Sequence, residues 1–244
     1  MRVAAQNGQP EIFYTLQGEG NMQGKPATFL RLSGCNLECV WCDTPYTWNW
    51  LDTKFDHPEK YDRFSQQINM SVEDLIEYWD YNPPQDEDIL VITGGEPMLQ
   101  QKDIIRLLEH KNFPFLIAEI ETNGTIKPDE YFRQLPAKFN VSPKLANSKM
   151  PKEKRIKLDT LEDYLSYEFT TLKFVVGNQE DLTEVNDLVA LLQPHKDKVL
   201  LMPEGRNQKD IQSKLAWLAQ ACMDNKYRLT NRLHVQTWGN TRGV

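Results

Sequence analysis

Three cysteines, Cys35, Cys39 and Cys42, lie within eight residues, directly after a segment at 27–33 whose composition predicts a strand. This spacing lets one loop direct three sulfurs to a common place, and thiolates are the usual ligands of iron–sulfur clusters and of zinc. No further Cys or His follows before His57, so a closed tetrahedral zinc site lacks its fourth ligand here. The spacing therefore favours a cluster with one open iron, while structural zinc and three unconnected thiols remain as alternatives.

Composition narrows the class of protein. With 244 residues, 40% of them hydrophobic, the chain is long enough for one α/β domain with a substantial core. The net charge of −7 argues against a nucleic-acid partner, because neutralising phosphates needs a basic surface. No apolar run approaches the roughly 20 residues of a membrane span, and the polar start at 1–7 lacks a signal-peptide core, so we expect a cytoplasmic protein without a membrane partner. Clustered cysteines also suit ligation in a reducing compartment, and the fourth, Cys222, reads as a core residue of a helix at 211–224.

A second motif, Gly94-Gly95-Glu96-Pro97, follows a buried-strand pattern at 88–93. In isolation, two glycines after a strand indicate only a turn. Together with the cysteine spacing, however, the motif resembles the pattern of radical S-adenosylmethionine enzymes. This resemblance implies that the three cysteines hold a [4Fe–4S] cluster and that S-adenosylmethionine chelates its fourth iron. It also implies that Gly94, Gly95 and Glu96 hold the methionine ammonium group.

The N-terminal region makes the resemblance more specific. The run Phe-Tyr-Thr-Leu-Gln-Gly-Glu-Gly at 13–20, the strand residue Arg31 and the pair Asp43-Thr44 together resemble the 7-carboxy-7-deazaguanine synthase family. That family converts 6-carboxy-5,6,7,8-tetrahydropterin to 7-carboxy-7-deazaguanine with loss of ammonia, on the route to 7-deazapurines such as queuosine. The resemblance implies a 5′-deoxyadenosyl radical that removes hydrogen from the pterin, followed by ring contraction.

The same resemblance suggests site residues, and their chemistry suits the task. Carboxylates and amides can bind the amide and amine edge of a pterin, and an Arg suits its carboxylate. The expected substrate contacts are Gln17, Gly18, Glu19, Gly20, Arg31, Glu121, His234 and Val244. The expected contacts of S-adenosylmethionine are Gly94, Gly95, Glu96, Ser142, Lys144, Asp43 and Asn178. Thr44 is expected to give its hydroxyl to Mg²⁺, a hard cation that prefers oxygen.

Each of these residues also has an ordinary interpretation. Arg31 could otherwise form a salt bridge or extend along the surface of its strand, although its position four residues before Cys35 favours the site. Asp43 could order its loop, and Lys144 could be a solvated side chain. Glu121 is placed in the loop after a strand at 115–120, where Glu119 shares its face but lies deeper. His234 otherwise reads as a polar residue on a last strand at 229–236.

The alternation of strand and helix patterns indicates an α/β fold, a partial (β/α)6-type barrel with its site at the carboxyl ends of about six parallel strands. We expect one radical S-adenosylmethionine domain over 1–244, with an insertion at 46–70 in which no period persists. An extended segment is expected at 11–17, and further strands are expected at 138–141, 171–176 and 198–202. Helices are expected to begin at 71–74 and to occupy 102–111, 129–134, 182–192 and 211–224. The Lys-rich stretch 145–160 reads as a loop, and His57, His110 and His195 read as surface residues without a metal role.

Partners are less constrained by the sequence. Family likeness suggests a homodimer and an electron donor such as flavodoxin or ferredoxin. The insertion could cover the pterin, dock another molecule, or pack on its own Trp and Tyr residues. Two other functions remain: a different radical enzyme such as a glycyl-radical activase, which would not need residues 17–20 or His234, and a zinc-stabilised binding module that uses the aromatic insertion.

Overall fold

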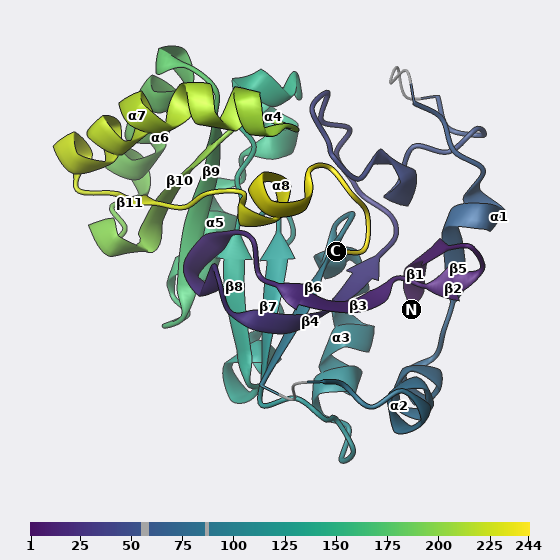
Figure 1. Ribbon diagram of the computed structural model, residues 1–244. Coiled ribbons are helices and arrows are strands. Elements are labelled where there is room, and N and C mark those ends of the chain that lie inside the picture. Colours follow the sequence, from purple (N-terminus) through teal and green to yellow (C-terminus); the bar gives the residue numbers. More distant parts are fainter. Residues whose placement is uncertain (55–58, 86–87) are drawn as a thin grey trace.

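A mostly parallel sheet forms the centre of the protein, as the computed structural model shows for residues 1–54, 59–85 and 88–244 (Figure 1). Six neighbouring strands run parallel to one another, in the order β10, β9, β8, β7, β6, β4, and the short β11 extends them beyond β10. Their bounds are β4 Pro26–Leu32, β6 Ile89–Gly94, β7 Ile117–Thr122, β8 Ala137–Val141, β9 Thr170–Val176, β10 Val199–Pro203 and β11 Arg228–Leu229. The expected α/β partial barrel is confirmed.

Four antiparallel strands extend the sheet beyond β4 and were only partly expected. The extended segment predicted around residues 11–17 is β3, which pairs with β4 in a hairpin. The pairing of β1 with β2, β4 and β5 was not predicted, because β1 and β2 are short and polar at their ends. The bounds are β1 Arg2–Gln6, β2 Gln9–Pro10, β3 Ile12–Leu16 and β5 Gln67–Asn69.

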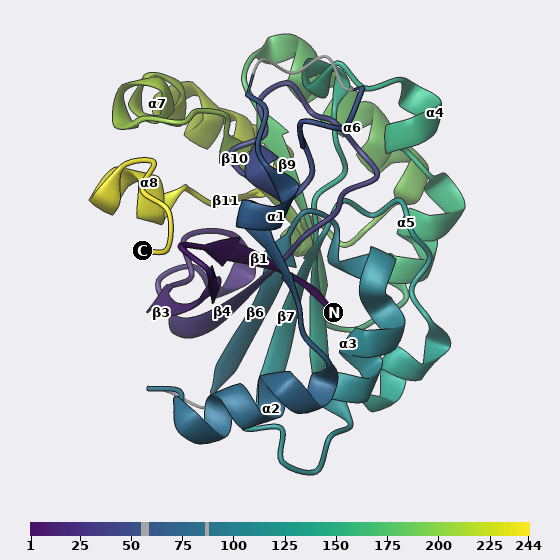
Figure 2. The ribbon, with the colours of Figure 1, turned by 90° about the vertical axis from the view of Figure 1, so that its right-hand side faces the viewer.

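Helices follow most of the parallel strands. Helices α3, α5 and α6 cover one side of the sheet, whereas α8 and the C-terminal end lie on the other side (Figure 2). The α-helices are α1 Arg63–Gln66, α2 Val72–Tyr81, α3 Gln101–Leu108, α4 Lys152–Arg155, α5 Leu158–Leu165, α6 Gln179–Leu192, α7 Gln208–Asn225 and α8 Leu233–Trp238. Short 3₁₀ turns occupy Gly20–Met22, Pro45–Thr47, Pro97–Gln100, Glu130–Gln134, Ala146–Ser148 and Lys196–Lys198.

The start of α2 illustrates how local sequence fixes an element. The Ser71 hydroxyl accepts a hydrogen bond from the Asp74 N–H at 3.0 Å, and the Asp74 carboxylate accepts one from the Ser71 N–H at 2.7 Å. This reciprocal pair satisfies two N–H groups that the first turn of a helix leaves without partners. The apolar face of this helix, at Leu75, Ile76 and Trp79, is buried in the core. The predicted helix start is therefore confirmed.

The main apolar core lies between the sheet and its helices. It runs from Val3 in β1 to Tyr227 before β11, so it draws on nearly the whole length of the chain. Aromatic side chains meet edge to face in its centre, where the Phe139 ring lies 5.0 Å from that of Tyr164 and 5.4 Å from that of Phe132. Among the helices of the described residues, none combines the length and apolar character needed to cross a bilayer.

Two sequence-based expectations are wrong. The stretch 145–160 is not a loop: it contains α4 and the start of α5, and buried Arg155 holds it through Glu184 at 2.5 Å and the Met150 carbonyl. The last strand ends at β11 and does not reach His234, which lies in α8. The chain leaves the sheet there because the Leu233 N–H donates to the Gly18 carbonyl at 2.9 Å, which draws the segment towards the N-terminal hairpin.

Smaller differences concern boundaries and histidines. Strand β7 ends two residues later than expected, so Glu121 lies within the strand and not in the loop after it. His195 is exposed as expected, and His110 is partly buried. His57 and its neighbours in the insertion fall outside the described residues.

Candidate active site

A cavity of about 480 Å³ opens at the carboxyl ends of the parallel strands. Thr93, Glu121, Val175 and Met202 line it from the ends of β6, β7, β9 and β10. The cavity brings together all the site residues expected from the sequence except Gly20, Glu96 and Asn178. Its wall therefore unites the cysteine loop, the loop after β3, the end of β6 and the C-terminal segment.

The cysteine loop and the Gly94-Gly95 pair at the end of β6 touch backbone to backbone. The Gly95 N–H donates to the Leu32 carbonyl at 3.0 Å, and the Glu96 N–H donates to the Gly34 carbonyl at 2.8 Å. A Cβ atom at Gly95 would lie 2.1 Å from the Gly34 carbonyl oxygen. Glycine is thus required at this position by the close approach of a second backbone.

The three thiols of the loop are free, with Cys39 buried and the other two partly buried. Burial raises the pKa of the Cys39 thiol to about 11 and also raises the pKa of the Cys35 and Cys42 thiols. Such thiols need the positive charge of a metal to become thiolates. Within the described parts of the chain, no three Cys, His, Asp or Glu side chains converge on the position of a single ion. Three thiolates that each bind a different iron of a cluster need not converge, so the loop fits a cluster.

The three expected site residues that do not line the cavity support the segments that do. Buried Glu96 accepts hydrogen bonds from the N–H groups of Met98 and Asn123 at 2.9 and 2.6 Å, and from the Thr122 hydroxyl at 2.7 Å. Its carboxylate therefore ties the loop after β6 to the end of β7. Asn178 caps the start of α6 with its side chain. Gly20 donates its N–H to the Thr230 hydroxyl at 2.9 Å.

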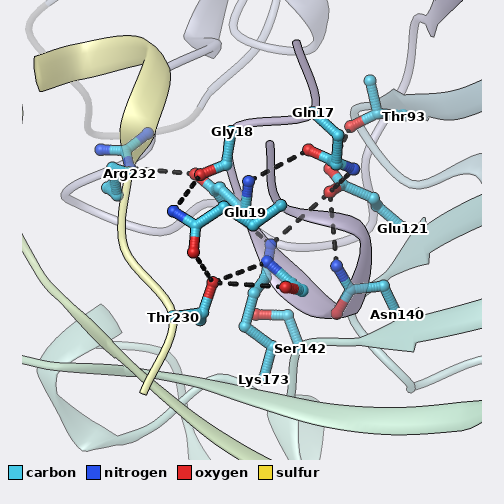
Figure 3. A network of polar contacts seen from close by, with 12 residues as sticks. Gln17, Gly18, Glu19, Thr93, Glu121, Asn140, Ser142, Lys173, Thr230 and Arg232 are labelled. Atoms are coloured by element: carbon cyan, nitrogen blue, oxygen red, sulfur yellow. Dashed lines mark hydrogen bonds and ion pairs between the residues drawn. The ribbon is translucent and has the colours of Figure 1, made fainter. Parts of the chain in front are cut away.

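A network of buried charges occupies the opposite wall (Figure 3). Lys173 on β9 pairs with Glu19 and lies 3.6 Å from Glu121, while Arg232 binds Glu19 at 3.0 Å and also pairs with Asp43. Burial alone would lower the pKa of Lys173, but Glu121 and Glu19 outweigh it and raise that pKa. Burial would raise the pKa of Glu19, but Lys173 and Arg232 hold it well below its usual range. Glu19 and Lys173 are therefore both charged at neutral pH.

The Gln17 amide lies between two carboxylates of β7. Its N–H group donates to Glu119 at 2.5 Å and to Glu121 at 3.3 Å, while its oxygen accepts from the Glu19 N–H at 3.1 Å. The Thr93 hydroxyl donates to the other Glu121 oxygen at 2.8 Å. Because each of these bonds has a defined donor, the orientation of the amide and of Glu121 is fixed before any ligand arrives.

Glu119, which accepts the hydrogen bond from Gln17, has a pKa that its surroundings move into a range that experiments can reach. Burial, together with the negative charge of Glu121, raises the pKa of Glu119 to about 7 from the usual 4.5. The folded protein therefore binds this proton more tightly than the unfolded chain does. The associated stability is present below about pH 4.5 and is lost as the pH rises through 7.

We therefore expect Glu119→Gln to remove much of the loss of stability between pH 5.5 and 8. At roughly 1.4 kcal/mol per pKa unit, and with about 1.5 pH units of this window lying below pH 7, the difference in the free energy of unfolding between the two pH values is about 2 kcal/mol larger in the wild type. Urea unfolding at both pH values measures it. Glu109→Gln, at an exposed position, is the control, and a pH dependence equal in all three proteins would contradict the assignment.

Arg31 combines the two roles that the sequence left open. Its guanidinium lines the cavity and also binds the buried carboxylate of Glu11 at 2.8 Å. Glu11 in turn accepts hydrogen bonds from the Tyr46 hydroxyl at 3.1 Å and from Arg242 near the C-terminus at 2.7 Å. Glu11 thus joins the N-terminal hairpin, the insertion and the C-terminal segment behind Arg31. Val244 belongs to the same segment and lines the cavity.

The remaining predicted residues lie around the cysteines and the network. His234 Nε2 is 3.9 Å from the Glu19 carboxylate, and burial lowers the pKa of its ring. Lys144 donates to the Ser142 hydroxyl at 3.1 Å. Thr44 places its hydroxyl 3.7 Å from the sulfur of Cys42, at the edge of the cysteine loop.

Sequence reasoning missed several cavity residues. Lys173 gave one usable signal, a lone charge in an otherwise buried strand, since a buried Lys needs paired carboxylates. Arg232 lies directly before the short helix α8, and no local pattern marks it. Arg206 donates to the backbone carbonyls of Trp41 and Cys42, which fixes the far side of the cysteine loop.

Comparisons with known proteins agree with this site. Residues 30–166 match the family model of the Radical SAM superfamily. Two curated proteins named 7-carboxy-7-deazaguanine synthase are similar along nearly their whole length. The one from Halobacterium salinarum is 35% identical, over 94% of this chain and 90% of its own, and the one from Pyrobaculum aerophilum is 31% identical, over 96% and 95%. The crystal structure of QueE from Escherichia coli superposes with a TM-score of 0.68 at 28% identity, covering 96% of this chain and 95% of that one. The chain therefore belongs to the Radical SAM superfamily and, within it, to the 7-carboxy-7-deazaguanine synthase family.

Proposed function

We propose that this protein converts 6-carboxy-5,6,7,8-tetrahydropterin to 7-carboxy-7-deazaguanine with loss of ammonia. The observation that carries the proposal is one cavity whose wall joins the three cysteines and the Gly94-Gly95 turn to a fixed set of carboxylates, an amide and Arg31. The first part of that wall suits radical chemistry, and the second suits a carboxylated pterin. Family membership points to the same reaction.

The cysteine side of the cavity would hold the cofactors. Cys35, Cys39 and Cys42 would ligate a [4Fe–4S] cluster, which together with S-adenosylmethionine supplies the radical chemistry of the superfamily when bound. Gly94 and Gly95 leave backbone accessible beside the cysteine loop, where carbonyl oxygens can accept from an ammonium group. Lys144, held by Ser142, offers a cation to the carboxylate of the same cofactor.

The opposite wall would hold the substrate. The N–H groups along the edge of a pterin need acceptors, and Glu19 and Glu121 present carboxylate oxygens held in place by Lys173 and Gln17. Arg31 offers a guanidinium to the substrate carboxylate. Gly18 allows His234 to approach, because a Cβ atom there would lie 2.1 Å from His234 Nδ1. The hydroxyl of Thr44 is the proposed protein ligand of Mg²⁺, with substrate and water completing the coordination.

The chain's own contribution is orientation and shielding. Buried charges that are already paired need no reorganisation when a reactive group forms beside them, and a closed wall excludes water and other hydrogen donors. The protein would act as a homodimer that receives electrons from a donor such as flavodoxin or ferredoxin. Residues 1–244 would form one domain, in which the insertion covers the cysteine side of the cavity through Tyr46, Trp48 and Tyr61.

Anaerobic reconstitution with iron and sulfide, followed by mass spectrometry, tests the proposal. With dithionite, S-adenosylmethionine, Mg²⁺ and carboxytetrahydropterin, we expect 5′-deoxyadenosine and carboxydeazaguanine to form together. Omitting the pterin should remove most of the deoxyadenosine, and chelating Mg²⁺ should slow product formation. Deoxyadenosine without the deazaguanine would indicate a different radical enzyme, and one zinc with no iron or sulfide would indicate a binding module.

A further inference from the structure

Trp48 connects the insertion to the cysteine loop. Its indole is buried, with 2% of the residue exposed, and its Nε1–H donates to the sulfur of Cys42 at 3.3 Å. This distance is normal for a hydrogen bond to sulfur, whose acceptor radius exceeds that of oxygen. The backbone holds the same segment in place, because the Gly34 N–H donates to the Thr47 carbonyl at 2.7 Å. The bond is therefore part of a fixed local structure.

The neighbouring tryptophans make different bonds. The indole of Trp50, also buried in the insertion, donates to the Tyr46 carbonyl at 3.2 Å, and that of Trp41 donates to the Asn147 side chain at 3.0 Å. Both thus end on oxygen, away from the sulfurs. Trp48 is the tryptophan whose polar hydrogen the fold directs at one of the three thiols of the loop.

We propose that Trp48 raises the reduction potential of the cluster through its hydrogen bond to Cys42. This inference rests on the proposed function, since it needs the cysteines to ligate a cluster. Reduction adds one electron and breaks no bond, and part of the added negative charge falls on the ligand sulfurs. An N–H dipole aimed at a sulfur stabilises the reduced form more than the oxidised form, so the potential rises. Burial strengthens the effect, because little solvent screens the dipole.

Trp48→Phe tests this role, because it keeps an aromatic ring and removes the N–H group. We expect the reconstituted variant to carry the same iron and sulfide as the wild type and to show a more negative midpoint potential. The measurement is an anaerobic redox titration followed by electron paramagnetic resonance of the reduced cluster, without S-adenosylmethionine or substrate. Trp50→Phe is the matched control and should leave the midpoint unchanged.

The outcomes separate this inference from the proposed function. A loaded Trp48→Phe variant whose midpoint is unchanged, or more positive, overturns the role of Trp48 while leaving the radical enzyme intact. A wild-type protein that takes up no cluster overturns both. If Trp48→Phe fails to load, site-specific replacement by 3-benzothienylalanine preserves the bicyclic shape without the N–H, and its midpoint decides in the same way.

Discussion

Lys173→Met is expected to lower the free energy of unfolding by about 3–5 kcal/mol at pH 8, the usual cost of removing one partner from a buried ion pair. Lys173 is buried, with 4% of the residue exposed, and it pairs with Glu19 and approaches Glu121. Methionine has a similar length but no charge, so the carboxylates of Glu19 and Glu121 lose the cation between them and repel each other more strongly. Turnover should fall with stability, because the same carboxylates line the cavity.

The loss of stability in Lys173→Met should depend on pH. Without Lys173 the carboxylates ionise less readily, so their pKa values rise and protonation relieves the strain. Urea unfolding should therefore show a smaller difference between variant and wild type at pH 5 than at pH 8. Lys138→Met is the control, since Lys138 is partly exposed and stacks on Phe169. Equal losses at the two positions would refute the importance of the network.

Gly95→Ala is expected to reduce turnover by at least about 100-fold, because a displacement of about 1 Å in a catalytic site can have that effect. The added Cβ would lie 2.1 Å from the Gly34 carbonyl oxygen and 3.2 Å from the Cys35 backbone nitrogen. Both neighbours are backbone, so no side-chain rotation relieves the clash and the cysteine loop must move. Iron content after reconstitution and the initial rate of product formation are the two measurements.

A matched glycine shows whether the effect comes from the clash. Gly177 follows β9, and a Cβ atom there would meet a side-chain oxygen of Asp181 at 3.3 Å, with no backbone atom in the way. We expect Gly177→Ala to keep its iron and most of its activity. A Gly95→Ala protein with full iron and wild-type rate would mean that the two loops can separate without consequence.

The parallel strands from β4 to β10 were predictable because the sequence pattern of each lies within the strand itself and its flanking turns. A run such as Ile89–Gly94 is apolar, short and bounded by turn residues, which is the pattern of a strand buried on both faces. The cysteine loop and the two glycines were predictable for the same reason, since each motif is contiguous. The helix at His234 was not, because a tertiary contact to Gly18 decides where the chain leaves the sheet.

The charge network could not be predicted, because its members are far apart in the sequence. Lys173 is 154 residues from Glu19, and Arg232 is 213 residues from it. No period or spacing links such positions, and a single charged residue in a loop is usually a solvated one. The sequence indicated carboxylates that could bind a ligand, but the cations that neutralise them emerge only from the fold.

The pairing of Glu19 with Arg232 also affects how the protein is made. At about 5–20 residues per second, the ribosome needs roughly 10–40 seconds to synthesise the 213 residues that separate them. For most of that interval the growing chain already carries its three thiols, while the wall that later encloses them is incomplete. Oxidants and cluster-donating proteins therefore meet an open loop first and a closed cavity later, which makes the oxygen tension during expression as important as the tension during purification.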